Sequence, residues 1–128
     1  MPSRSSSLLV VEDTVNIRLI VQIALERAGY TVTSVGTGSA AMQALATTPY
    51  ALLLTDLHLP DMDGTDLIRQ AQRLPDCPAV LVMSGTAWED GLGRDATLHD
   101  VAFLAKPFLF DDLLAAVAHA LMPVRCAA

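Results

Sequence analysis

Hydrophobic residues are grouped along this chain into five short runs, and each run ends at a polar residue or a glycine. The runs are Leu8–Val11, Thr31–Val35, Tyr50–Thr55, Pro78–Met83 and Val101–Ala105. Short apolar or β-branched runs bounded by such residues are typical of strands that are buried on both faces of a sheet. The pattern therefore predicts five strands in one parallel sheet.

The segments between these runs carry helical patterns. Within residues 14–28 the apolar positions follow helical spacing and predict one buried helix face, made by Ile17, Ile20, Val21, Ala24 and Ala28. Further helices are expected over residues 39–47, 65–73 and 111–121. Strands that alternate with helices in this way indicate an α/β fold, in which right-handed crossovers place helices on both faces of the sheet.

The weakest expected helix lies within residues 87–99. Gly91 and Gly93 fall inside it, and a glycine in a helix interior costs about 1 kcal/mol relative to alanine. We expect this helix to be short, frayed or mobile. The whole domain is expected to cover residues 7–122, between a disordered leader at 1–6 and a short tail at 123–128.

Composition excludes several classes of protein. The chain has 128 residues, of which 52% are hydrophobic and 17% charged, so it is one ordered domain rather than a disordered segment. No run approaches the roughly 20 apolar residues of a membrane span. The net charge is −6 and Lys106 is the only lysine, which argues against direct nucleic-acid binding. We expect a cytoplasmic protein in which Cys77 and Cys126 are reduced and inert.

Polar side chains follow four of the five predicted strands. Glu12 and Asp13 follow the first strand, Asp56 the third, Ser84 the fourth and Lys106 the fifth. Because parallel strands end at the same edge of a sheet, these residues are expected to converge there. Three clustered carboxylates repel one another, and a Mg²⁺ ion, which prefers carboxylates, waters and a phosphate oxygen, would offset that repulsion.

A carboxylate in such a cluster can attack a phosphoryl group and form an acyl phosphate. Asp56 is the best-placed nucleophile because it is central in the expected sheet. Mg²⁺, Lys106 and the Ser84 hydroxyl would stabilise the negative charge of the transferred group. The residues therefore predict phosphoryl-transfer chemistry at this edge.

Four motifs in order carry a resemblance to a known family. They are Val11-Glu-Asp13, Asp56-Leu-His-Leu-Pro-Asp-Met-Asp-Gly64, Met83-Ser-Gly-Thr86 and Lys106-Pro-Phe108. The chain resembles the receiver domain of two-component response regulators over about residues 7–122. The resemblance implies a flavodoxin-like, doubly wound sheet of five parallel strands in the order 2-1-3-4-5, with five helices.

The resemblance also implies roles for single residues. Asp56 matches the aspartate that accepts the phosphoryl group. Glu12 and Asp13 match the acidic pair that holds Mg²⁺ together with Asp56, with Asp13 the more direct ligand. The backbone carbonyl of His58 matches a further ligand of the metal.

Three more positions match the catalytic and switch residues of the family. Ser84 matches the hydroxyl that moves toward the phosphoryl group, and Lys106 matches the lysine that pairs with it. Phe103 matches the aromatic residue that reorients when the hydroxyl moves.

The implied function is phosphorelay signalling. The phosphoryl donor would be a histidine kinase or a histidine phosphotransfer protein, and the chain would catalyse only its own phosphorylation and autodephosphorylation. Phosphorylation would switch the face made by residues 87–99, 101–105 and 111–121 for an output partner or a homodimer, with Leu109 and Phe110 adding apolar surface. The chain is either a stand-alone receiver or a piece of a longer protein such as a hybrid histidine kinase.

Three other functions fit the sequence less well. A haloacid-dehalogenase-like phosphatase would have a second aspartate where His58 stands. A flavodoxin-type flavin or nucleotide binder would have a Gly/Ser/Thr-rich loop after the first strand to hold phosphate, whereas Glu12 and Asp13 would repel phosphate in the absence of a metal. A degenerate receiver is disfavoured because every reactive position is filled.

The roles of three residues stay open. His58 is either a solvated loop residue or a residue that controls hydrolysis of the phosphoryl group. Leu19 and Ile23 are either scattered exposed residues or a docking patch for the phosphoryl donor.

Overall fold

The computed structural model describes residues 7–84 and 101–121. The five strands are β1 (Ser7–Val11), β2 (Thr31–Val35), β3 (Leu52–Asp56), β4 (Ala79–Ser84) and β5 (Val101–Ala105). The helices in the described part of the chain are α1 (Val15–Arg27), α2 (Gly38–Thr47), α3 (Gly64–Gln72) and α4 (Phe110–Ala120). The further helix expected within residues 87–99 lies outside the described residues.

The strands form one parallel sheet in the order β2-β1-β3-β4-β5, which confirms the expected flavodoxin-like arrangement. From β1 the chain first moves to β2 on one side, and from β2 it crosses back over β1 to β3 on the other side. The direction of winding therefore reverses next to β1. In open α/β sheets such a reversal, at the carboxyl ends of the strands, is where sites are found.

The register brings all five strands to an end at the same edge of the sheet. Val11 pairs with both Val35 and Thr55, and the last pair of β4 and β5 joins Ser84 and Ala105. The residues that follow these strands therefore start from one edge, as the sequence predicts.

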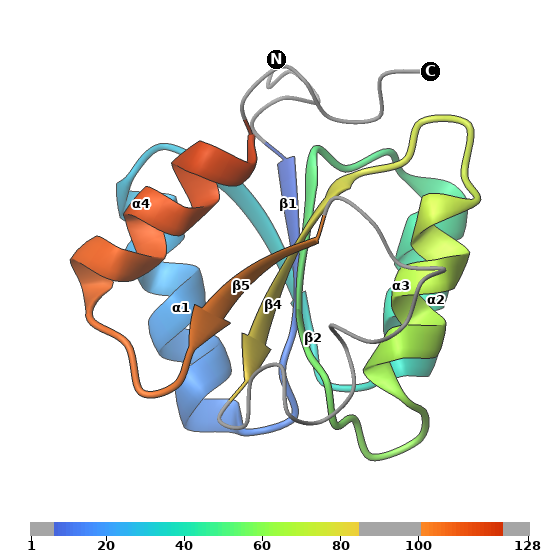
Figure 1. Ribbon diagram of the computed structural model, residues 1–128, viewed down its shortest axis with the longest axis horizontal. Coiled ribbons are helices and arrows are strands. Elements are labelled where there is room, and N and C mark those ends of the chain that lie inside the picture. Colours follow the sequence, from blue (N-terminus) through green and yellow to red (C-terminus); the bar gives the residue numbers. More distant parts are fainter. Residues whose placement is uncertain (1–6, 85–100, 122–128) are drawn as a thin grey trace.

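Helices cover both faces of the sheet, with α1 and α4 on one side and α2 and α3 on the other (Figure 1). Alternate strand residues point to opposite faces, so Leu8, Val10, Leu52 and Leu54 share a buried cluster with side chains of α1 and α4. The residues between them belong to the cluster on the α2 and α3 side: Leu9, Val11, Leu53, Ala41, Leu45, Leu67 and Ala71. Both faces of the sheet are therefore apolar and covered by helices.

The helix face expected for residues 14–28 is partly wrong. Val21 and Leu25 are the fully buried residues of α1, whereas Ile20 is 49% exposed. Ala28 is also exposed, because the helix ends at Arg27. Apolar residues occur around more than half of α1, so helical spacing alone does not single out the side that meets the sheet.

Cys77 is disulfide-bonded in the structure, so the expectation that it is reduced is wrong; Cys126 lies outside the described residues. Among the described helices, none is both long and apolar enough to span a membrane.

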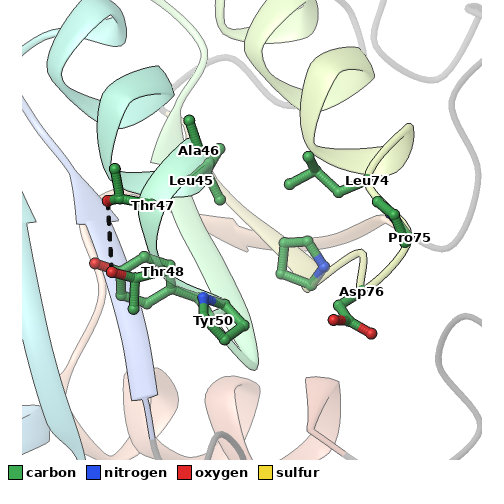
Figure 2. A pocket seen from close by; sticks show the side chains of 10 residues that line it. Leu45, Ala46, Thr47, Thr48, Tyr50, Leu74, Pro75 and Asp76 are labelled. Atoms are coloured by element: carbon green, nitrogen blue, oxygen red, sulfur yellow. Dashed lines mark hydrogen bonds between the residues drawn. The ribbon is translucent and has the colours of Figure 1, made fainter.

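A pocket of about 260 Å³ lies at the opposite edge of the sheet, where the strands begin. It is formed by the end of α2, the segment between α2 and β3 and the segment before β4, including Thr47, Tyr50, Leu74 and Asp76 (Figure 2). The acids and the lysine singled out by the sequence do not line it. The pocket is therefore separate from the candidate site.

Candidate functional site

Three carboxylates converge where β1 and β3 end. Glu12 and Asp13 begin the segment after β1, and Asp56 is the last residue of β3. One carboxylate oxygen from each lies within 4.8 Å of the others. Glu12 is fully buried, Asp13 is exposed and the Asp56 side chain is 15% exposed. The cluster therefore runs from the interior of the protein to its surface.

Lys106 supplies the opposite charge. It follows β5, and its Nζ lies 2.7 Å from Glu12 Oε1 and 2.7 Å from Asp56 Oδ2. Burial of the amine lowers the pKa of Lys106, but hydrogen bonds and charge attraction to Asp56 and Glu12 outweigh burial and raise that pKa above its ordinary value. Lys106 is therefore held as a cation between the two carboxylates, which offsets their mutual repulsion.

All four polar atoms of Glu12 have hydrogen-bond partners. Its amide donates to Val35 O over 3.1 Å, and its Oε2 accepts from Thr14 N over 3.0 Å. Its carbonyl oxygen accepts from Arg18 Nη1 over 3.0 Å, and its Oε1 accepts from Lys106. A buried carboxylate is tolerated when it is paired in this way.

Asp56 is held by the loop that follows it. His58 N donates to Asp56 Oδ1 over 3.3 Å, and Thr55 Oγ1 donates to the Asp56 carbonyl over 2.9 Å. A Cβ at position 64 would lie 2.5 Å from Asp56 O and 2.7 Å from Leu57 O. Gly64 is therefore needed for α3 to start against the end of β3.

The same loop is tied to α2 by Asp61. Its two carboxylate oxygens accept from Gly38 N over 2.8 Å and from Ser39 N over 2.9 Å. These backbone hydrogen bonds, first that of Ser39 and then that of Gly38, hold the pKa of the Asp61 carboxyl below its usual value. No local sequence pattern links Asp61 to these partners, because they are more than 20 residues away along the chain.

The remaining predicted site residues lie around the same edge. The backbone of Ser84 ends β4 beside Ala105. Phe103 of β5 is half-buried and packs against the cluster made by Leu57, Ile68, Val80 and Val82. The His58 side chain is exposed, and it is the His58 amide that contacts Asp56. Two large apolar residues that follow Lys106 are exposed as expected, Leu109 at 72% and Phe110 at 58%.

Comparison with known proteins identifies the family. Residues 8–118 match the family model described as the response regulator receiver domain. The chain belongs to this family. Its fold is likewise that of the chemotaxis response regulator CheY4 of Vibrio cholerae, with a TM-score of 0.82 at 23% identity, over 90% of this chain and 98% of that one.

Curated relatives give the same result. The chain is 37% identical over 108 residues to the response regulator receiver protein CpdR of Brucella abortus, which covers 84% of this chain and 89% of CpdR. It is 36% identical over 115 residues to the DNA-binding transcriptional regulator NtrC of Escherichia coli, which covers 88% of this chain but 24% of NtrC. The receiver-domain resemblance is therefore confirmed, and with it a place in two-component signalling. Receiver domains interact with histidine kinases and with output domains.

The bridging position of Lys106 gives a stability prediction. Lys106→Met leaves the buried Glu12 carboxylate without its cation, so without divalent metal the free energy of unfolding should fall by roughly 1–3 kcal/mol. Because the pKa of Lys106 is raised in the folded protein, this contribution is complete below the ordinary value of 10.5 and is lost as the pH rises through the raised pKa. Urea unfolding at pH 7 and above pH 10.5 measures both effects.

Arg69→Met is the matched control. Arg69 pairs with Asp66 over 2.8 Å on the exposed side of α3, and an exposed pair contributes only about 0–1 kcal/mol. A loss on Lys106→Met no larger than that of the control, or one that stays constant above pH 10.5, would contradict the bridging role.

Proposed function

We propose that this domain signals by accepting a phosphoryl group from phosphohistidine on Asp56. The observation that carries the proposal is the position of Asp56, at the end of a central strand, partly exposed, and with Lys106 Nζ 2.7 Å from its Oδ2. In the transfer a carboxylate oxygen of Asp56 attacks phosphorus, the phosphorus–nitrogen bond breaks, and the imidazole leaves with the bonding electrons. The product is an acyl phosphate on Asp56.

The donor set at the site fits Mg²⁺. This cation takes carboxylate oxygens, waters and phosphate oxygens rather than a complete cage of protein ligands. We assign Asp13 and Asp56 as its carboxylate ligands, with Glu12 in the same acidic cluster and the backbone carbonyl of His58 as a further ligand. Because the Glu12 side chain is fully buried whereas Asp13 is exposed, Asp13 is the better direct ligand. When bound, Mg²⁺ would neutralise charge on the phosphoryl oxygens.

The chain's own residues supply the remaining chemistry. Lys106 is positioned to pair with a phosphoryl group on Asp56, and Ser84, which ends the neighbouring strand, is proposed to donate its hydroxyl to the same group. Asp56 returns to the carboxylate when water attacks phosphorus. Because phosphorylation and hydrolysis both take place at Asp56, the domain catalyses only its own phosphorylation and dephosphorylation. The exposed ring of His58 fits either role left open by the sequence, a solvated loop residue or a group beside the water.

Asp56→Asn tests the acceptor. Wild-type protein treated with acetyl phosphate and Mg²⁺ should gain one phosphoryl group, and the Asn variant should gain none, because the amide is not a nucleophile toward phosphorus. Intact-protein mass spectrometry measures the gain. Asp66→Asn, on an exposed face of α3, is the matched control and should be labelled like wild type; equal labelling of Asp56→Asn would refute the assignment.

The proposed donor surface is an exposed apolar stripe on α1, made by Val15, Leu19 and Ile23. These residues are spaced four apart, so they share one side of the helix, and they are 54%, 50% and 52% exposed. The stripe begins at Val15, two residues after Asp13. A helix that carries a phosphohistidine could pack along the stripe and place its phosphoryl group above the acids.

Replacing Leu19 with Asp tests this surface. Leu19→Asp should slow phosphotransfer from a phosphorylated histidine phosphotransfer protein by tenfold or more, because it puts a charge into an apolar contact. Labelling by acetyl phosphate, which needs no docking, should be unchanged. Met42→Asp, at an exposed apolar position of α2 on the other face of the sheet, is the control, and equal slowing of both variants would contradict docking on α1.

The proposed output surface is separate from the α1 stripe and lies around β5 and the start of α4, next to Lys106. Phosphorylation can only bias states that it contacts differently. We propose that Ser84 moves toward the phosphoryl group, that Phe103 reorients, and that the surface next to the exposed Leu109 and Phe110 changes with them. An exposed apolar patch beside a switch is suited to self-association or to binding an output partner.

Phe110→Ser tests this surface. With Mg²⁺ and fluoroberyllate bound, sedimentation should show that wild-type protein associates into dimers and that Phe110→Ser associates several-fold more weakly. Labelling of Phe110→Ser by acetyl phosphate should equal that of wild type. Ile23→Ser serves as the comparison on α1. If Ile23→Ser rather than Phe110→Ser prevents association, the output surface is α1; if fluoroberyllate causes no association of wild type, self-association through this face is wrong.

A further inference from the structure

The Arg18 side chain reaches from the first turns of α1 back to the acidic segment that precedes the helix. Its Nη1 donates to the carbonyl oxygen of Glu12 over 3.0 Å. That carbonyl belongs to the peptide group between Glu12 and Asp13. Arg18 is half-buried.

Gly36 leaves room for this contact. A Cβ at position 36 would lie 2.5 Å from Arg18 Nη1 and 3.6 Å from Arg18 Cζ. The third neighbour of that Cβ is Glu12 O at 4.0 Å, which is ordinary contact. Gly36 does not have the positive φ of Gly29, so its backbone suits alanine, and the guanidinium is what a methyl group would displace.

We propose that Arg18 is a positioning residue that holds the Glu12–Asp13 peptide, and through it the Asp13 carboxylate, in the orientation that binds Mg²⁺. The amide of Glu12 is held by Val35 and its carboxylate by Thr14 and Lys106. These contacts fix the amide and the side chain of Glu12, but they do not hold the Glu12 carbonyl, so the Glu12–Asp13 peptide group can still rotate.

Rotation of that peptide group changes the backbone on both sides of it, and Asp13 is the residue on its outer side. Asp13 is exposed, so no burial restrains its side chain. The Arg18 contact therefore orients the one carboxylate of the cluster that packing does not hold. Groups that orient a metal ligand in this way typically change metal affinity by about 10–100-fold when they are removed.

The inference rests on the proposed Mg²⁺ site, and direct metal binding tests it. Mg²⁺ affinity of the complete chain is measured by isothermal titration calorimetry, with acetyl phosphate labelling at saturating Mg²⁺ as a second readout. Arg18→Ala should weaken Mg²⁺ binding about tenfold, while labelling at saturating Mg²⁺ stays close to wild type. Arg69→Ala, which removes a half-buried arginine of α3 that pairs with Asp66, should bind Mg²⁺ like wild type.

Gly36→Ala distinguishes positioning from a simple effect of charge. It leaves the charge of Arg18 in place but displaces the guanidinium, so it should also weaken Mg²⁺ binding several-fold. In the Arg18→Ala background the same change should have no further effect, because the atoms that the methyl group meets are gone. Arg18→Lys, which keeps the charge with a single shorter donor group, should give an intermediate affinity.

Other outcomes would contradict the positioning role of Arg18 or the metal site itself. If Arg18→Ala lowers the unfolding midpoint but keeps wild-type Mg²⁺ affinity, Arg18 only stabilises the fold. If the losses from Arg18→Ala and Gly36→Ala add in the double variant, the two residues do not act through one contact. If wild-type protein binds no Mg²⁺, the proposed metal site itself is wrong and this inference falls with it. Should Arg18→Ala fail to fold, Gly36→Ala and Arg18→Lys carry the test.

Discussion

The buried carboxylate of Glu12 is the group on which the rest of the site depends. A carboxylate removed from water has to be paired and hydrogen-bonded, and Thr14 N and Lys106 Nζ supply these two contacts. The backbone of Glu12 is held as well, by the end of β2 and by Arg18 of α1. The same lysine lies 2.7 Å from Asp56. The requirement to pair a buried acid thus places a cation beside the proposed phosphoryl acceptor.

The fold makes this meeting unavoidable. Parallel strands end at one edge, and the winding of the chain reverses beside β1, so the segments after β1, β3 and β5 share one place. On the side of the sheet that carries α1 and α4, both helices begin near that edge (Figure 1). The exposed apolar residues Val15 and Phe110 therefore start the two surfaces proposed for the donor and for the output.

Much of this arrangement could be predicted from the sequence, since runs of buried residues mark parallel strands and the residues after them mark the site. The convergence of Glu12, Asp56 and Lys106 follows from that rule alone. The contact of Arg18 with Glu12 could not be predicted, because helical spacing does not say how far a long side chain reaches. Asp61 was missed because its partners belong to a distant helix, and Ile20 was misplaced because α1 is apolar on more than one side.

The most direct measurement is the chemical identity of the phosphorylated residue. Protein labelled with acetyl phosphate and Mg²⁺ is reduced with borohydride, which converts an aspartyl phosphate into homoserine and releases phosphate, and the peptides are sequenced by mass spectrometry. Phosphorylation of Asp56 predicts homoserine at position 56 and unchanged aspartate at position 13. Homoserine at another carboxylate, or a stable phosphate on a hydroxyl or a histidine, would contradict it.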